Sequence, residues 1–325
     1  MERGPADVYS PALSSQSSRV VNAALIGNVL VAVTKFVAAA ITGSSAMTSE
    51  AVHSLVDTGN ELLLLYGLRR ASKPPDADHP FGHGRELYFW SFIVALGIFA
   101  LGACASVYEG VLHLQSPVRI RNPAVNYVVL ALALVFEGGS LWVAFKQFRA
   151  AKGEMGVWEA VRKSKDPTTF TVLAEDTGAI LGILIALVGT VAAEVLDRPV
   201  LDGVASVAIG VLLGLIAIVL ARETKGLLIG EPARSELVSS ICAMARAQPG
   251  IERSNGLFTV HIGPREVVAA LSVDFTDTLT AGEVETIVAA LEDRVRKAHP
   301  EVVSLLVKPQ KWDRADFTDL PAEEE

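Results

Sequence analysis

Ionisable side chains interrupt an otherwise apolar stretch at residues 44–68, and they recur at helical spacing. The polar positions that share one stripe of such a helix, or lie one turn before it, are Glu50, His53, Asp57, Asn60 and Glu61. Ionisable groups are costly in a bilayer and by default face the interior of a helix bundle. His53 and Asp57 lie one turn apart and are able to bind one divalent ion together. A structural hydrogen-bonded pair is the alternative, but the cost of placing both groups in an apolar span favours metal transport.

The composition also indicates a membrane protein. Of the 325 residues, 51% are hydrophobic, and the mean hydropathy of +0.41 is too high for an ordinary soluble chain. The apolar runs fall within residues 20–222, whereas the chain from residue 230 reads as a soluble, acidic domain. That acidic balance argues against nucleic acid as a partner. The two cysteines form no CxxC motif, so neither a disulfide framework nor a thiolate metal site is expected.

The apolar runs divide into stretches long enough to cross a core of ~30 Å at ~1.5 Å per residue. The six predicted helices cover residues 20–41, 45–70, 87–113, 123–149, 168–196 and 200–221. The loops after the second and fourth helices hold ten Lys or Arg residues, against three in the other loops. The positive-inside rule therefore places the even-numbered loops and both termini in the cytoplasm. With no cleaved signal expected, the favoured location is a bacterial inner (plasma) membrane.

The soluble part predicts a small α+β domain. Its expected order is a helix at 235–247, strands at 256–261 and 267–275, a helix at 281–298 and a strand at 302–308. Thr280 and Glu283 have the spacing of a capping box at the start of the second helix. The expected domains are a flexible cytoplasmic N-terminus (1–18), a six-helix transport domain (19–225), a cytoplasmic domain (226–312) and an acidic tail (313–325).

These features resemble the cation diffusion facilitator (cation efflux) family of metal/proton antiporters, from about Val20 to Lys308. The resemblance rests on SSAMTSEAVHSLVDTGNE at 44–61 and PPDADHPFGHGR at 74–85. A third segment, KDPTTFTVLAEDTGAILGILIALVG at 165–189, is similar to a divergent branch that includes a mitochondrial zinc exporter. The resemblance implies a homodimer of six-helix subunits, each with a cytoplasmic ferredoxin-like domain. It also implies export of Zn²⁺ or a similar cation in exchange for protons, with no cofactor.

The family's metal ligands in the second helix fall on His53 and Asp57. In the fifth helix the family has His-x-x-x-Asp, but Thr168 and Val172 occupy those positions here. We therefore infer that Asp176 supplies the missing ligand, with Glu175 as the second candidate. Asn60 is either an auxiliary ligand or a hydrogen-bond donor. The family's second metal site, in the cytoplasmic loop, falls on Asp76, His79 and His83. The alternative interpretation of these three residues is a capped turn with exposed histidines.

One imidazole with two or three carboxylates suits Zn²⁺ and tolerates Mn²⁺, Fe²⁺, Co²⁺ or Cd²⁺. The absent histidine makes the site richer in oxygen and leaves Mn²⁺, Fe²⁺ or Co²⁺ export as an alternative. His53, with an ordinary pKa of ~6.5, is the natural proton-coupling group. Lys35, in the middle of the first predicted helix, is expected to neutralise Glu50 or Glu137, and the basic segment 146–165 is expected to face anionic lipid headgroups.

Two other classes of protein would also place metal-binding residues in a membrane domain. An intramembrane metal-dependent hydrolase would need an open coordination position and a general base, and no HExxH motif is present. The chain is therefore not expected to be an enzyme. A non-transporting metal sensor would need ligands in the soluble domain. The isolated His261 and His299 read there as ordinary surface or half-buried histidines, which argues against sensing.

Overall fold

The structure is a computed structural model, and it describes residues 15–152, 156 and 165–312. The chain divides into two compact units. The membrane unit comprises Met1–Pro74 with Glu86–Lys225, and the second unit comprises Pro75–Arg85 with Gly226–Glu325. Of the predicted flexible segment 1–18, residues 15–18 are helical and the others lie outside the described residues. The predicted acidic tail, 313–325, also lies outside them.

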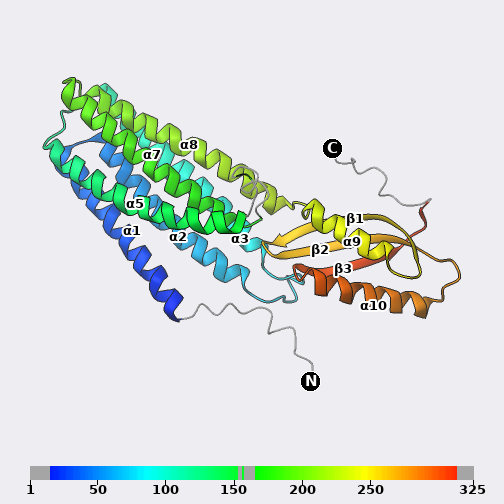
Figure 1. Cartoon of the computed structure of the whole chain (residues 1–325). Coiled ribbons are helices and arrows are strands. Elements are labelled where there is room, and N and C mark those ends of the chain that lie inside the picture. Colours follow the sequence, from blue (N-terminus) through cyan, green and yellow to red (C-terminus); the bar gives the residue numbers. More distant parts are fainter. Residues whose placement is uncertain (1–14, 153–155, 157–164, 313–325) are drawn as a thin grey trace. The chain divides into compact units, whose positions relative to one another are not determined.

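Long helices build the membrane unit (Figure 1). They are α1 (Ser15–Thr42), α2 (Ser45–Ala71), α3 (Arg85–Gly97), α4 (Cys104–Gln115), α5 (Pro123–Lys152), α7 (Pro167–Val195) and α8 (Val200–Ile229). A π-helical segment, η2 (Ile98–Ala103), joins α3 to α4, so that these three elements form one span. The six predicted stretches therefore all fall on helices.

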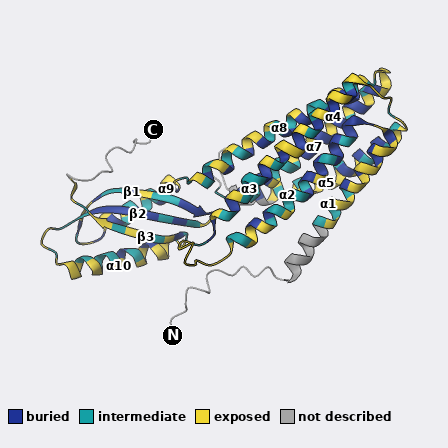
Figure 2. Cartoon of the chain, turned by 180° about the vertical axis from the view of Figure 1, so that it is seen from behind, coloured by how far each residue is buried: buried dark blue, intermediate teal, exposed yellow. Residues whose placement is uncertain are grey.

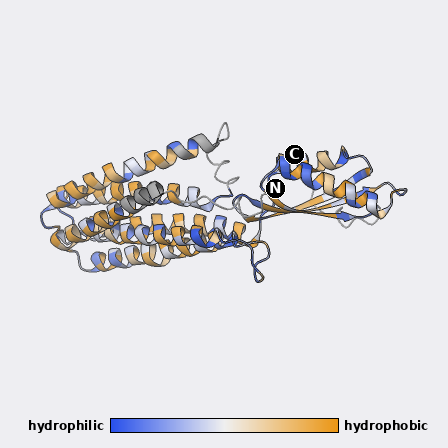
Figure 3. Cartoon of the chain, turned by 90° about the horizontal axis from the view of Figure 1, so that it is seen from below, coloured by the Kyte–Doolittle hydropathy of each residue, from blue (hydrophilic) through white to orange (hydrophobic). Residues whose placement is uncertain are grey.

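Five of these helical spans, within the described residues, are long and apolar enough to cross a membrane. The exception is α2, whose 27 residues are long enough but carry the ionisable stripe. Large apolar side chains such as Leu132, Val135 and Val188 are more than half exposed, as expected for positions that face lipid. Figure 2 shows the buried positions and Figure 3 the prevalence of apolar residues along these helices.

The last membrane helix, α8, extends beyond the predicted end at residue 221 to Ile229. The charged residues that follow residue 221 end the apolar stretch, but nothing there ends the helix. Gly230 does so, because its φ of +122° is one that other residues rarely adopt. Hydropathy therefore located the end of the apolar part of α8, whereas backbone chemistry set the end of the helix.

The second unit contains α9 (Ser235–Arg246), β1 (Ile251–Gly263), β2 (Glu266–Phe275), α10 (Ala281–Ala298) and β3 (Val302–Pro309). The sheet order is β1-β2-β3, with β1 antiparallel and β3 parallel to β2. Ile241, Leu271 and Leu291 contribute to a core that both helices share with the three strands. This arrangement fits the predicted ferredoxin-like domain. β1 is longer than predicted because bulges near both of its ends break the alternation that marks a strand.

The predicted capping box at the start of α10 is confirmed. The Thr280 amide donates to Glu283 Oε2 (2.8 Å), and the Glu283 amide donates to Thr280 Oγ1 (3.4 Å). The bonds that the Thr280 amide and then its hydroxyl donate to Glu283 also hold the pKa of that carboxyl below the usual range.

We expect Thr280→Ala to destabilise the first turn of α10 by ~1 kcal/mol. Hydrogen exchange of the amides in that turn, measured in the full-length protein, should then accelerate about fivefold. Thr286→Ala is the matched control, since Thr286 is an exposed threonine of the same helix that bonds only to the Gly282 carbonyl. Equal exchange rates in both variants would contradict a stabilising role for the box.

Candidate functional site

His53 and Asp57 meet on α2 with their ligand atoms uncommitted. His53 is 2% exposed, and its Nδ1 lies 3.3 Å from Asp57 Oδ1. The two groups are poorly aligned, however, so that among the described residues neither His53 ring nitrogen nor Asp57 Oδ1 has a hydrogen-bond partner. Buried polar atoms without partners are costly, and a cation would satisfy them. The sequence-predicted pair is thus arranged as a ligand pair rather than as a hydrogen-bonded one.

A cavity of about 610 Å³ lies beside Asp57, between α1, α2, α5 and α7. It extends along α2 as far as Leu68. The polar residues that line it are Asn28, Ser54, Asp57, Glu61, Glu137, Ser140, Thr168, Glu175 and Asp176. Five carboxylates on three helices therefore face one space, which gives that space the charge and the oxygen donors that a divalent cation requires.

The two α7 carboxylates both line this cavity but turn to different helices. Glu175 Oε1 accepts a hydrogen bond from Asn60 Nδ2 of α2 (2.7 Å), whereas Asp176 Oδ2 accepts one from Ser140 Oγ of α5 (3.0 Å). Successive residues point about 100° apart on a helix, which accounts for the difference. Thr168 and Val172 also line the cavity. Glu175 and Asp176 therefore line the same cavity as the two positions at which the resemblance leads us to expect metal ligands.

Sequence reasoning did not assign Asn28, Ser140 or Glu137 to the site. Asn28 Nδ2 donates to Glu61 Oε2 (2.9 Å), which holds that carboxylate at the cavity wall. Glu137, which the sequence offers as a partner for Lys35, lines the cavity. The available signal was that Glu137 is the one acidic residue of the apolar stretch 123–149.

Lys35 forms the expected ion pair, and its partner is Glu50. Lys35 Nζ lies 3.0 Å from Glu50 Oε2 and donates to Ser54 Oγ (2.8 Å). Both charged side chains are fully buried. Glu50 is thereby bound to α1 and does not line the cavity, although it lies on α2 one turn from His53.

The loop between α2 and α3 brings Asp76, His79 and His83 together, and one donor atom from each lies within 4.8 Å of the others. His83 Nε2 is 3.0 Å and His79 Nδ1 is 3.2 Å from the Asp76 carboxylate. The His83 bond, followed by the His79 backbone amide, lowers the pKa of Asp76 to about 2. Gly82, with a φ of +84°, makes the turn that returns His83 to Asp76. Two imidazoles and a carboxylate suit Zn²⁺.

We expect His83→Ala to weaken Zn²⁺ binding at this loop at least about tenfold, or ~1.4 kcal/mol. Equilibrium titration of the full-length protein with Zn²⁺, in an Asp57→Ala background that removes the membrane ligand, would report Zn²⁺ binding at the loop alone. His299→Ala is the matched control, since His299 is in the same unit and bonds to Ser240 Oγ at 2.8 Å. Equal loss of affinity in both variants would contradict ligation by His83.

Among the described residues, no other group of three such donors converges within 4.8 Å. The membrane donors face a common cavity but are further apart, so that an ion bound there must draw their side chains together. In the second unit, His261 on β1 is buried (7% exposed), whereas the sequence analysis expected a surface or half-buried histidine. The basic segment 146–165 lies mostly outside the described residues.

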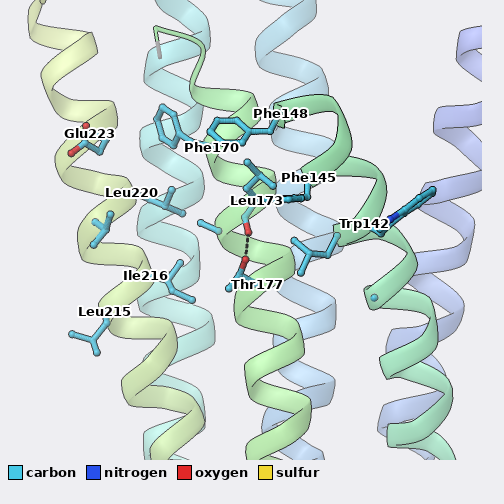
Figure 4. A pocket seen from close by; sticks show the side chains of 14 residues that line it. Trp142, Phe145, Phe148, Phe170, Leu173, Thr177, Leu215, Ile216, Leu220 and Glu223 are labelled. Carbon is cyan, nitrogen blue, oxygen red and sulfur yellow. Dashed lines mark hydrogen bonds between the residues drawn. The ribbon is translucent and has the colours of Figure 1, made fainter. Parts of the chain in front are cut away.

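A second cavity, of about 800 Å³, lies between α5, α7 and α8 (Figure 4). Trp142, Phe145, Phe170 and Leu220 are among its largely apolar lining, and Thr177 Oγ1 is bonded to the Leu173 carbonyl (2.7 Å). This cavity offers few donors to a cation. The α7 helix thus presents carboxylates to the polar cavity and apolar side chains to this one.

Comparison with known proteins agrees with the geometry. The sequence profile described as the cation efflux transmembrane domain matches residues 21–229. A human protein named proton-coupled zinc antiporter SLC30A9, mitochondrial, is 35% identical over 260 residues, which is 79% of this chain and 46% of that protein. The Arabidopsis thaliana metal tolerance protein C4 is 33% identical over 261 residues, 80% of this chain and 57% of that protein.

A shorter match is the magnetosome protein MamM of Paramagnetospirillum magneticum, 33% identical over 118 residues and 36% of each chain. The chain spans about half of the length of the longer curated relatives that it matches. The helical membrane unit, the ionisable stripe of α2 and the extent of the profile match lead to one assignment: the chain belongs to the cation efflux family.

Proposed function

We propose that this protein exports Zn²⁺ from the cytoplasm in exchange for protons. The observation that carries the proposal is the His53–Asp57 pair, whose unpartnered atoms lie beside a cavity lined with carboxylates from α2, α5 and α7. The names of the human and A. thaliana relatives, a proton-coupled zinc antiporter and a metal tolerance protein, support a metal cargo.

The proposed transport ligands are His53, Asp57 and one or both of Glu175 and Asp176. With both α7 carboxylates, one nitrogen and three oxygens supply the four ligands of a zinc site; with only one of them, the protein supplies three ligands and one position stays open. The bond from Asn60 connects Glu175 directly to α2, which now makes Glu175 as strong a candidate as Asp176. Asn60 then acts by orienting Glu175, or as an auxiliary ligand. Asp76, His79 and His83 form a proposed second metal site in the loop.

Proton coupling follows from the chemistry of these donors. A metal ion needs deprotonated imidazole and carboxylate, so protons and metal compete for the same atoms. When the site faces a more acidic compartment, protonation of His53 and the carboxylates helps to expel the ion. The protonated site then returns without metal, which completes one exchange.

The direction of transport is proposed from charge. The cavity extends along α2 toward Arg69 and Arg70, which belong to the basic flank that the positive-inside rule assigns to the cytoplasm. In this arrangement the described state is open to the cytoplasm, and the second unit is cytoplasmic. The proposed location is a bacterial inner membrane. A homodimer, with the second unit supporting dimerisation, is proposed from the family resemblance alone.

Export of Mn²⁺, Fe²⁺ or Co²⁺ is a second candidate function, favoured by one observation. The cavity is lined by five carboxylates, and oxygen-rich sites lean toward harder cations than zinc. A competition series with these ions and Cd²⁺ against Zn²⁺ would rank them.

The test of the proposed function is metal flux into proteoliposomes with and without an imposed pH gradient. We expect gradient-dependent Zn²⁺ flux, and loss of most of it in Glu175→Gln, in Asp176→Asn or in both. Glu194→Gln is the matched control, because Glu194 is on α7 but bonds to Tyr127 outside the cavity. If the Zn²⁺ flux of neither α7 variant falls below the flux of this control, the assignment of the α7 ligand is wrong. If wild-type protein carries none of these metals, the transport proposal itself is wrong.

A further inference from the structure

At the end of α2 opposite the cavity, two side chains of α8 hold α2 in place. Asp202 Oδ1 accepts a hydrogen bond from Ser44 Oγ (2.7 Å), and Asp202 Oδ2 accepts from the Ser45 and Ala46 backbone amides. One turn further along, Ser49 Oγ and Ser206 Oγ lie 2.6 Å apart. Ser206 donates to the Ser106 carbonyl (2.9 Å), so Ser49 is the donor to Ser206.

This end of the membrane unit is closed. Asp202, Ser44, Ser49 and Ser206 are all fully buried, as is Met47 between them. On the other side of His53, the polar cavity begins at Ser54 and Asp57 and follows α2 toward its other end. An ion at His53 and Asp57 therefore has a space on one side and packed side chains on the other.

α8 contacts α4 as well as the start of α2. Besides the Ser206 bond to the Ser106 carbonyl, Asp202 Oδ2 lies 3.8 Å from His113 Nε2 of α4. Against α4, the backbone of α8 packs closely on the backbone of α4. A Cβ atom added to Gly203 would lie only 3.2 Å from the Gly110 carbonyl oxygen. Against the start of α2, α8 makes side-chain hydrogen bonds through Asp202 and Ser206. Backbone packing of that closeness leaves little room for movement, whereas a few polar bonds are able to break and re-form.

We propose that Asp202 and Ser206 form a lock that closes the membrane unit on the side opposite the cavity and releases α2 when the site opens to that side. This inference rests on the proposed transport function, since alternating access requires such an opening. Asp202 is a positioning residue in this role. It accepts three donors at the N-terminus of α2, where the helix dipole also favours a negative charge.

A purely structural cap would make the same contacts in every state, so the test must report opening rather than stability. Ser45→Cys provides a reporter, because Ser45 is buried and its Oγ has no partner among the described residues. It would be placed in a Cys104→Ala, Cys242→Ala background and reconstituted in oriented liposomes. A membrane-impermeant thiol reagent is then added on the side opposite the cavity.

We expect Asp202→Ala to accelerate labelling of this cysteine at least tenfold, and Asp202→Asn, which keeps one carbonyl acceptor, to do so less. Asn126→Ala is the matched control, since Asn126 is a fully buried polar residue whose amide atoms have no partner within the described structure. If the cysteine is labelled no faster in Asp202→Ala than in the Asn126→Ala control, the proposed lock is wrong. Labelling requires no flux, so this result is independent of whether the proposed function holds.

A second measurement uses the cysteine pair Ser49→Cys and Ser206→Cys, whose parent oxygens are close enough for a disulfide. Diamide would oxidise the pair, and mass spectrometry would confirm the bond. Metal flux should fall at least tenfold and recover with reductant, while Zn²⁺ binding in a His83→Ala background persists. Undiminished flux through the cross-linked protein would show that α2 and α8 stay together throughout transport, and the lock would be wrong.

Discussion

Replacing Asp57 by asparagine should reduce metal flux by more than about 100-fold, which corresponds to ~2.7 kcal/mol. Asparagine keeps the size of the side chain and one oxygen, but it removes the charge that faces both His53 Nδ1 and the cavity. The loss should therefore come from metal binding and proton exchange, with the fold intact. Zinc flux in proteoliposomes, together with thermal unfolding of the same preparations, separates these effects.

Asp197→Asn is the matched control for this change. Asp197 is exposed between α7 and α8, pairs with Arg119, and has a φ of +49° that asparagine tolerates. Its flux should equal that of wild type. Flux through Asp57→Asn at the level of this control would remove Asp57 from the transport site.

The second large effect is expected at Lys35. Lys35→Met leaves Glu50 buried without its ion-pair partner, and breaking a buried pair in this way costs about 3–5 kcal/mol. The double change Lys35→Met, Glu50→Gln removes both charges and should recover most of that loss. Unfolding of the detergent-solubilised protein by heat or denaturant would measure both variants. Equal stability of the single and double variants would mean that the pair adds little.

The features that could be read from the sequence are those fixed by local chemistry. The stripe of α2 follows from helical spacing alone, and the capping box at Thr280 follows from a pattern four residues long. Hydropathy located the membrane helices, because each one must satisfy its backbone internally and face lipid. The loop site was predictable because its three donors lie within eight positions of the sequence.

The features that could not be read depend on contacts between distant segments. The rotation of α7 decides whether Glu175 or Asp176 faces α2, and that rotation is set where Gly182 packs against Glu50 and Gly189 against Ala205. Asp202 is separated from Ser44 by 158 positions, so that no local pattern pairs them. Likewise, the partner of Lys35 became clear only when the packing of α1 on α2 selected Glu50 over Glu137.

The π-helical segment η2 has a consequence for how this family member tolerates changes in chain length. A π turn holds one residue more than an α turn, so the six residues of η2 shift the helical phase between α3 and α4 by about 100°. Gly110, which follows the segment, packs against Gly203 in the phase that η2 sets. Deleting a single residue within η2 would remove the extra residue of the π turn, so that a continuous α-helix would keep Gly110 facing Gly203. A one-residue deletion should therefore be far better tolerated within η2 than in α3 or α4, where it would turn the rest of the span by about 100°.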